Sequence, residues 1–226
     1  MVEIDLRNLI VTYRYAIAMP DRKVSYYDLM NKWLTEPHLS QIYNGKLLLS
    51  ISPISTDGTH LFTQIALDIE GGKNTKEAFN FSTRFINHNK DFYMTYTGKT
   101  GFHIFSKFLV MTDIMHIQDL RYMLIDPLNI STSMLDYNSS IRNVPMIRIG
   151  YRHDTHTLAT PVSPTINYNT FVKKMTNVTD FKTIMSLKDM KKFISSKIFP
   201  ANNIINHKTY LRKIKHIIDE NNEYVF

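Results

Sequence analysis

The sequence of 226 residues contains no cysteine. This absence excludes disulfide bonds and thiolate zinc sites within the chain, and it is common in cytosolic proteins. Glycine and proline are also scarce, with 7 and 8 residues, so long flexible linkers are not expected. No run of about 18 apolar residues occurs, and such a run is what a transmembrane helix requires. We therefore expect a protein of the cytoplasm, without a membrane partner and without zinc.

Apolar and basic residues are plentiful. Apolar residues make up 43% of the chain and aromatic residues 12%, enough for the core of one ordinary domain. The net charge is +7, and its distribution is uneven. Residues 1–170 contain 16 Lys and Arg against 15 Asp and Glu, whereas residues 171–226 contain 11 against 5. A basic segment of this kind is typical of proteins that bind nucleic acid or an anionic surface, although a solvated basic helix gives the same pattern.

The local patterns predict both helices and strands. β-branched and aromatic runs predict strands over 46–54 and 60–72 and a hairpin over 91–111, and residues 134–164 alternate between strand and turn patterns. Apolar spacing predicts helices over 29–34, over 74–89 with Asn74 or Thr75 as the cap, and over 113–125. From Tyr168 onward the pattern is helical and basic. We predict an α+β fold with an antiparallel or mixed sheet and flanking helices.

The composition changes near Pro161–Pro164, where strand patterns give way to helical ones. We place the boundary between two regions just after this change. Residues 1–170 form the predicted core, and residues 171–226 form a small basic helical segment or subdomain.

The stretch Gly98-Lys99-Thr100 is similar to the end of a phosphate-binding P-loop. A P-loop also has a glycine five residues before that Gly, where this chain has Tyr93, and a helix directly after the Lys-Thr pair. The run that follows is instead aromatic and β-branched, which favours a strand. The stretch is therefore predicted to be a turn between two strands, the second of which carries His103.

Two carboxylates end the strand predicted over residues 60–72. Asp68 and Glu70 are two positions apart, so their side chains share one face of a strand, while Leu67 and Ile69 share the other. Like charges at this spacing repel unless a cation neutralises them, and Mg²⁺ or Mn²⁺ accepts such hard oxygen ligands. An exposed strand end with two solvated acids is the simpler alternative.

Cationic side chains accompany these acids. Taken singly, Lys99 is typical of a solvated turn lysine and His103 of a half-buried strand histidine. Together, facing two carboxylates, they suit a triphosphate and its metal. Farther along the chain, Asp136 is a candidate third acid, although Asp residues also form turns. Arg148 is a further candidate phosphate ligand because its guanidinium offers a planar fork.

The order of these motifs resembles the archaeo-eukaryotic primase (primase-polymerase) superfamily. The family's acidic pair, small-x-His motif and hydrophobic-Asp motif correspond to Asp68-Ile69-Glu70, Gly101-Phe102-His103 and Leu135-Asp136. Residues 97–103 are similar to its Ser-Gly-basic-basic-Gly-x-His turn, with Thr100 in place of the second basic residue. An Arg, then a His, then a turn and a strand follow the third acid, which favours Asp136 over its rival Asp126. The resemblance covers about residues 60–165.

The resemblance implies a DNA-dependent nucleotidyltransferase, a primase or a DNA polymerase, that makes or extends primers on a single-stranded template in replication. It implies two Mg²⁺ or Mn²⁺ ions held by the catalytic residues Asp68, Glu70 and Asp136, and a nucleotide site formed by Lys99, Thr100, Gly101, His103 and Arg148. The implied partners are template, primer and NTP or dNTP substrates.

The resemblance also bears on what accompanies the domain. Relatives encoded by archaeal plasmids and viruses often continue into a helicase or further domains, and a chain of that origin would act inside the host cell. Many relatives carry a zinc-binding element, and this cysteine-free chain departs from them.

Two other functions use the same features. A replication-initiator or other nucleic-acid-binding domain would keep the scaffold without catalysis, but clustered carboxylates give no advantage to a protein that only binds polyanions. A metal-dependent nuclease would use the same three acids, but it has no need of a lysine-histidine pair for a triphosphate.

Overall fold

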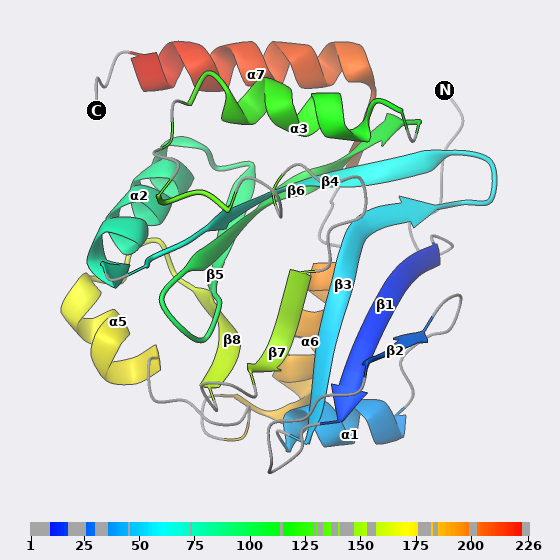
Figure 1. The fold of residues 1–226 in the computed structure, drawn as a ribbon, viewed down its shortest axis with the longest axis vertical. Coiled ribbons are helices and arrows are strands. Elements are labelled where there is room, and N and C mark those ends of the chain that lie inside the picture. The colour runs from blue at the N-terminus through cyan, green and yellow to red at the C-terminus, as the bar shows by residue number, and fades with distance from the viewer. Residues whose placement is uncertain are drawn as a thin grey trace.

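The computed structural model describes residues 10–17, 26–29, 36–44, 46–72, 74–113, 115–128, 130, 133–136, 140, 147–152, 157–175, 182, 185–198 and 203–222. These residues form a mixed α+β fold, as the sequence predicted (Figure 1).

Nine strands are described. They are β1 (Ile10–Ile17), β2 (Tyr26–Leu29), β3 (Leu47–Thr56), β4 (Leu61–Ile69), β5 (Phe92–Tyr96), β6 (Phe102–Thr112), β7 (Ile147–Arg152), β8 (Thr157–Val162) and β9 (Asn203–Ile205). Their order is β2-β1-β3-β4-β6-β5-β8-β7, with neighbours antiparallel, and β9 pairs parallel with β6. The edge of β3 opposite β1 pairs with β7 over Leu48–Ile51 and with β4 over Ile54–Thr56. The pairing of β3 with β4 is therefore short, and it ends at Thr63 of β4.

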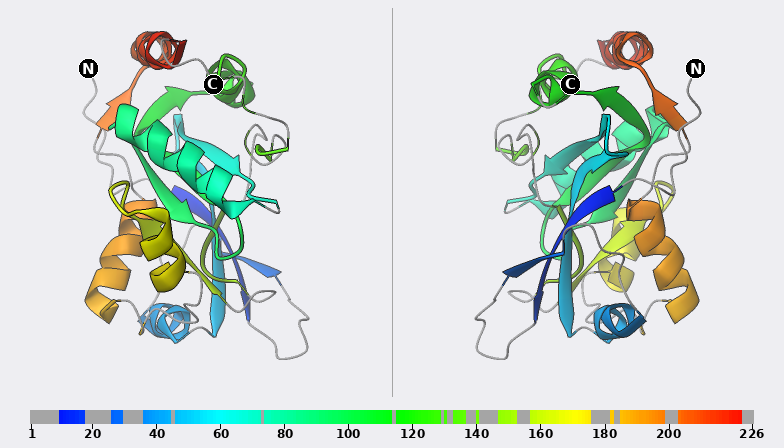
Figure 2. Two further views of the ribbon diagram at one scale, coloured as in Figure 1. Left: turned by 90° about the vertical axis from the view of Figure 1, so that its left-hand side faces the viewer. Right: turned by 90° about the vertical axis from the view of Figure 1, so that its right-hand side faces the viewer.

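Six helices are described around the sheet. They are α1 (Glu36–Tyr43), α2 (Thr75–His88), α3 (Ile117–Ile125), α5 (Tyr168–Met175), α6 (Leu187–Ile198) and α7 (His207–Asn222). α2 and α5 cover one face of the sheet, α3 and α7 lie side by side at one end, and α1 and α6 pack together at the opposite end (Figures 1 and 2). None of the helices in the described ranges is long and apolar enough to cross a bilayer.

The helices cover the apolar side of β4, β5 and β6. Alternate residues of these strands, among them Leu67, Ile69 and Ile104, belong to one buried cluster. Aromatic side chains of the helices complete that cluster: Phe79 of α2 stacks on Phe171 of α5 with ring centroids 5.0 Å apart. Since successive side chains of a strand point to opposite faces, the residues between these apolar positions, including Asp68, point to the opposite face of the sheet. That face is also buried at Ala66 and Phe105.

Residues beyond position 170 contribute to the same core. Ile205 of β9 and Tyr210, Ile214 and Ile217 of α7 are buried in the cluster that contains the strand residues. The Tyr210 hydroxyl donates a hydrogen bond to the carbonyl oxygen of Leu120 in α3. The sequence change near residue 170 is therefore a change in charge, and the packing continues across it.

Most predicted elements occur where the sequence placed them. The strands within 46–54 and 60–72, the 91–111 hairpin, and the helices within 74–89 and 113–125 are confirmed. The helix expected over 29–34 is wrong at Leu29, which ends β2, and the other residues of that stretch lie outside the described ranges. β9 was missed because three residues are too few for a period-two pattern within a basic helical segment.

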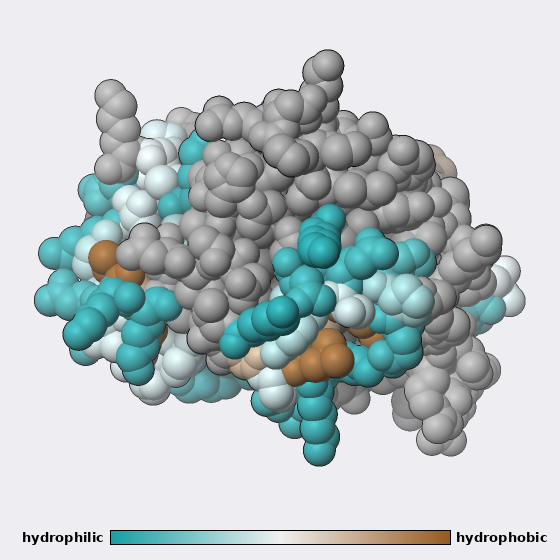
Figure 3. All heavy atoms as spheres, turned by 90° about the horizontal axis from the view of Figure 1, so that it is seen from below, coloured by the Kyte–Doolittle hydropathy of each residue, from teal (hydrophilic) through white to brown (hydrophobic). Residues whose placement is uncertain are grey.

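The described part of the surface at the end that carries α1 is largely polar. Figure 3 views the molecule from this end, and its described surface is largely hydrophilic with a few apolar residues. Glu36, Ser40 and Gln41 of α1 are exposed, whereas Ile42 is fully buried against the rest of the fold. Lys191 of α6 forms an ion pair with Glu36 at 2.6 Å, which joins the two helices.

Candidate metal centre

The first acid lies opposite the candidate histidine. β4 and β6 pair antiparallel in a register that places Asp68 directly across from His103. Cross-strand partners share a face of the sheet, so both side chains point away from the helices. His103 Nε2 lies 3.6 Å from Asp68 Oδ1, and the two side chains are 7% and 15% exposed. The pair is thus mostly withdrawn from water at the end of the sheet.

An aromatic row adjoins this pair on the same face of the sheet. Tyr93 of β5 lies opposite Phe105 of β6, one row farther from the strand ends, and their rings stack with centroids 5.3 Å apart. Burial raises the pKa of Tyr93, and its hydroxyl accepts a 3.4 Å hydrogen bond from the side chain of Gln64. This row gives the acidic end of the sheet a rigid apolar neighbour.

The turn between β5 and β6 packs against the end of β4. Thr97 N–H donates to Gly101 O at 3.0 Å, and Gly98 adopts a φ of +85°, which glycine tolerates. A Cβ at Gly101 would lie 2.4 Å from Ile69 O, and one at Gly71 would lie 1.8 Å from Thr100 O. Both positions therefore need glycine, because the turn backbone touches the backbone that follows Asp68 and Glu70.

The third acid is positioned by a short backbone pairing between its segment and β4. After β3 leaves its edge, β4 pairs with the segment around Leu135 by an isolated antiparallel bridge from Ile69. Glu70 N–H donates to Met134 O at 2.5 Å, and Asp136 N–H donates to Asp68 O at 2.9 Å. These two bonds fix Asp136 beside the acidic pair although it is 66 residues away in sequence.

Ser140 supports this arrangement, and sequence analysis did not identify it. Asp68 N–H donates to Ser140 Oγ at 3.0 Å, and Ser140 N–H donates to Asp136 O at 3.0 Å. Ser140 is 1% exposed. A serine four residues after an aspartate is too common a spacing to single out, so only the folded chain identifies it as a residue that joins the two acidic segments.

Asp68, Glu70 and Asp136 together form the one group of metal-ligand type found among the described residues. Each offers a carboxylate oxygen, and these oxygens all lie within 4.8 Å of one another. Mg²⁺ binds oxygens at about 2.1 Å, so ligands across an octahedron lie about 4 Å apart. The three oxygens therefore lie near the separations that ligands of one divalent ion require.

The other predicted site residues have different placements. Lys99 is exposed and Thr100 partly buried in the turn that touches Gly71, beside the end of the strand that carries the first two acids. Asp126 is exposed at the end of α3, where it accepts a 3.3 Å hydrogen bond from the Tyr122 hydroxyl, and it is not part of the acidic group. Of the two rival aspartates, the structure brings Asp136 to Asp68 and Glu70.

Arg148 is placed by its backbone alone. It pairs with Ser50 in the ladder between β7 and β3, and its side chain lies outside the described part of the structure. The sequence pattern that follows the third acid continues from Arg148 to a histidine, His153, which lies outside the described ranges altogether.

The chain matches no protein-family model, and it matches no curated protein sequence.

Proposed function

We propose that the chain is a divalent-metal-dependent nucleotidyltransferase of the primase-polymerase type, acting on a single-stranded template. The observation that supports this proposal most is the meeting of three carboxylates from distant parts of the chain beside a buried histidine. Clustering anions costs free energy, about 1 kcal/mol for each pair near 4 Å even in water. A cation that binds all three offsets this repulsion.

The acids supply the ligands, and the hairpin supplies the cationic groups. When bound in such a centre, Mg²⁺ or Mn²⁺ activates a hydroxyl and neutralises charge on phosphoryl oxygens. His103 holds a nitrogen near Asp68, where it orients that carboxylate or donates to a phosphate oxygen. Lys99 extends from the adjoining turn into solvent, and its ammonium suits a triphosphate. The backbone of the turn packs closely against Gly71.

The test compares the two rival aspartates. Asp136→Asn keeps the shape of the side chain and removes its charge, so we expect Mn²⁺-dependent incorporation of labelled nucleotide on a primed single strand to fall by about a thousandfold. Asp126→Asn is the matched control and should incorporate at the wild-type rate. Wild-type incorporation by the Asp136 variant would refute the assignment of the third acid.

The same preparations distinguish the rival functions. Incubation with single-stranded DNA and Mn²⁺ in the absence of nucleotides reports nuclease activity. Cleavage that requires Asp136, without any nucleotide incorporation by the wild type, would replace the polymerase proposal with a nuclease. Binding without either reaction would leave a non-catalytic nucleic-acid-binding domain.

A further inference from the structure

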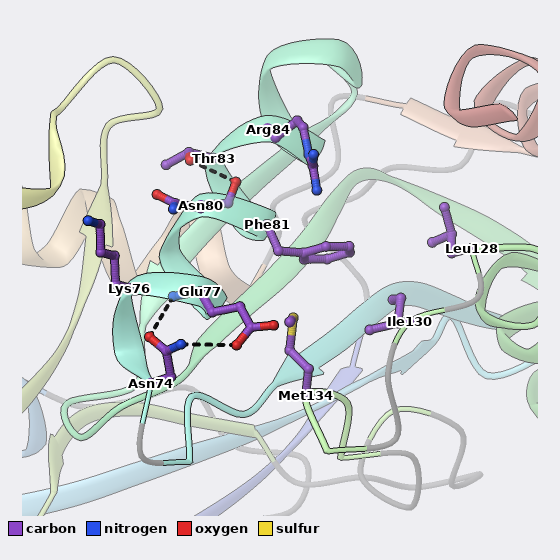
Figure 4. Close-up of a pocket in the computed structure, with 10 residues that line it drawn as sticks. All are labelled: Asn74, Lys76, Glu77, Asn80, Phe81, Thr83, Arg84, Leu128, Ile130 and Met134. Carbon is purple, nitrogen blue, oxygen red and sulfur yellow. Dashed lines mark hydrogen bonds between the residues drawn. The ribbon is translucent and has the colours of Figure 1, made fainter. Parts of the chain in front are cut away.

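A groove lies beside the acidic group, between α2 and the chain segment that leads to Asp136. Its volume is about 840 Å³, within the range of ~300–1,000 Å³ typical of ligand pockets. One wall is α2, and the facing wall contains Leu128, Ile130 and Met134. Figure 4 shows the ring of Phe81 projecting from α2 toward this apolar wall.

The groove is joined to the candidate metal centre by two backbone hydrogen bonds. Met134, on the apolar wall, accepts a hydrogen bond from Glu70 N–H at 2.5 Å. Asn74, at the start of α2, donates its N–H to Gly71 O at 2.6 Å. The wall of the groove and the ligands of the centre are therefore parts of the same short segments.

Polar and charged side chains surround the apolar part of the groove. Lys76 and Arg84 contribute two positive charges, Glu77 contributes one negative charge, and Asn80 and Thr83 add uncharged polar groups. Glu77 is tied to the start of the helix, because Asn74 Nδ2 donates to its carboxylate at 3.1 Å. The net charge of the side chains that line the groove is therefore positive, and the neighbouring centre carries three negative charges.

We propose that this groove holds a single strand of nucleic acid and guides it to the acidic centre, an inference that rests on the proposed function. An aromatic and aliphatic floor flanked by cations is the combination that binds unpaired bases together with their phosphates. A duplex presents its phosphates outward and hides its base faces, so it would not use the apolar floor. The two cations also offset the repulsion between a polyanionic strand and the three carboxylates.

The first experiment uses the absence of cysteine from the chain, which makes a single introduced thiol specific. Asn80→Cys places a thiol in the groove at an exposed position of α2, and Ser40→Cys places one on exposed α1 as the matched control. Alkylation by a maleimide is followed in EDTA with increasing amounts of an oligothymidylate. We expect the oligonucleotide to slow alkylation at position 80 at least tenfold and to leave position 40 unchanged. A blunt duplex should protect neither position.

Equal alkylation rates at position 80 with and without saturating oligonucleotide would overturn the proposal. Because EDTA removes catalysis, this result is independent of nucleotide incorporation. If the oligonucleotide protects position 80 but the protein never incorporates nucleotides, the groove proposal stands and the proposed function is refuted. If position 80 is unprotected in a protein that incorporates nucleotides, the proposed function stands and the groove proposal is refuted.

A charge reversal provides the second measurement. The double variant Lys76→Glu with Arg84→Glu should weaken binding of the same oligonucleotide, measured by fluorescence anisotropy, by about tenfold. The dependence of log affinity on log salt should become shallower by about 1.4, since each phosphate contact to a single strand contributes about 0.7.

The matched control is Lys208→Glu with Arg212→Glu on exposed positions of α7, which alters charge equally in the basic C-terminal segment. A larger loss from the α7 variant than from the groove variant, with an unchanged salt slope for the latter, would assign strand binding to α7 and refute the groove.

Discussion

The two ends of the β4–β6 strand pair contain the same kinds of residues and use them differently. At the far end Asp57 accepts hydrogen bonds from Thr59 N–H and His60 N–H, at 2.8 and 2.6 Å, and contacts the His60 ring. Asp113, which follows the partner strand at that end, accepts likewise from Met115 and His116 N–H and contacts the His116 ring. Each carboxylate there shapes its own turn.

At the near end the acids face one another. Asp68, Glu70 and Asp136 come from two separate segments, and their oxygens lie within 4.8 Å. Their histidine partner, His103, lies across the sheet from Asp68 and not three residues along the same turn. Local structure accounts for an acid that is paired within its own loop. It does not account for acids brought together by tertiary contacts, and the proposed metal ligands are of this second kind. This difference separates candidate function from turn formation.

The largest expected effect comes from the same substitution made at both ends. Asp68→Asn should reduce nucleotide incorporation by about a thousandfold, because it removes a ligand charge from the centre. Asp57→Asn changes only a turn and should retain full incorporation. Steady-state rates with Mn²⁺, measured on folded preparations of both variants, give the comparison. Similar losses in both variants would erase the distinction between the two ends.

Glycines at the two ends should differ in their effect on stability. Gly71→Ala forces a Cβ into the Thr100 carbonyl, at 1.8 Å, and should lower the free energy of unfolding by about 3 kcal/mol. Gly58→Ala meets open space and only strains a φ of +92°, at a cost of about 1 kcal/mol. Urea unfolding monitored by circular dichroism measures both. A smaller loss at Gly71 than at Gly58 would contradict the close packing of the turn on β4.

Metal should stabilise the near end. In EDTA, Glu70→Gln should raise the unfolding free energy by up to about 1 kcal/mol, because it relieves repulsion within the group. Addition of Mn²⁺ at a hundred times its dissociation constant should stabilise the wild type by about 2.7 kcal/mol and the variant much less. Thermal unfolding with and without Mn²⁺ measures both changes. The corresponding change of an acid to its amide at the far end, Asp113→Asn, should leave the stabilisation by Mn²⁺ unchanged.

The smallest expected effect is on the pH dependence of stability, and it concerns Asp57 at the far end. Hydrogen bonds from the backbone of His60 and Thr59 lower the pKa of Asp57 from 3.8 to about 2. A lowered pKa means that this carboxylate contributes stability above pH 4, and that the contribution disappears as the pH falls through 2. Asp57→Asn should therefore differ from the wild type at pH 5 and converge with it near pH 2. Acid unfolding curves of the two proteins provide the test. A difference in stability that stays constant between pH 5 and pH 2 would contradict the lowered pKa of Asp57 as its cause.

Local sequence was sufficient for much of this fold. The β-branched and aromatic run within 60–72 predicted β4, and the spacing of Asp68 and Glu70 predicted their common face. The apolar spacing predicted α2 with Asn74 or Thr75 as its cap, and the structure has Asn74, whose side chain accepts a hydrogen bond from Glu77 N–H. Both depend on neighbours within a few residues. The order of motifs was enough to favour Asp136 over Asp126, which the structure places apart from the other acids.

Other features depend on contacts that no local pattern contains. The role of Ser140 requires hydrogen bonds to a strand 72 residues away. The close approach of the Thr100 carbonyl to Gly71 joins two segments that are far apart in sequence. Burial of Tyr210 against α3 likewise joins the basic C-terminal segment to the core, although charge alone marked that segment as separate.

The segment of residues 134–136 carries one acid and also occupies the edge of β4 that β3 leaves. An uncovered strand edge is a template for pairing with a second molecule. Release of this segment would thus expose the edge of β4 to pairing with a second molecule. A ligand that binds all three carboxylates would hold the segment in place and so disfavour self-association.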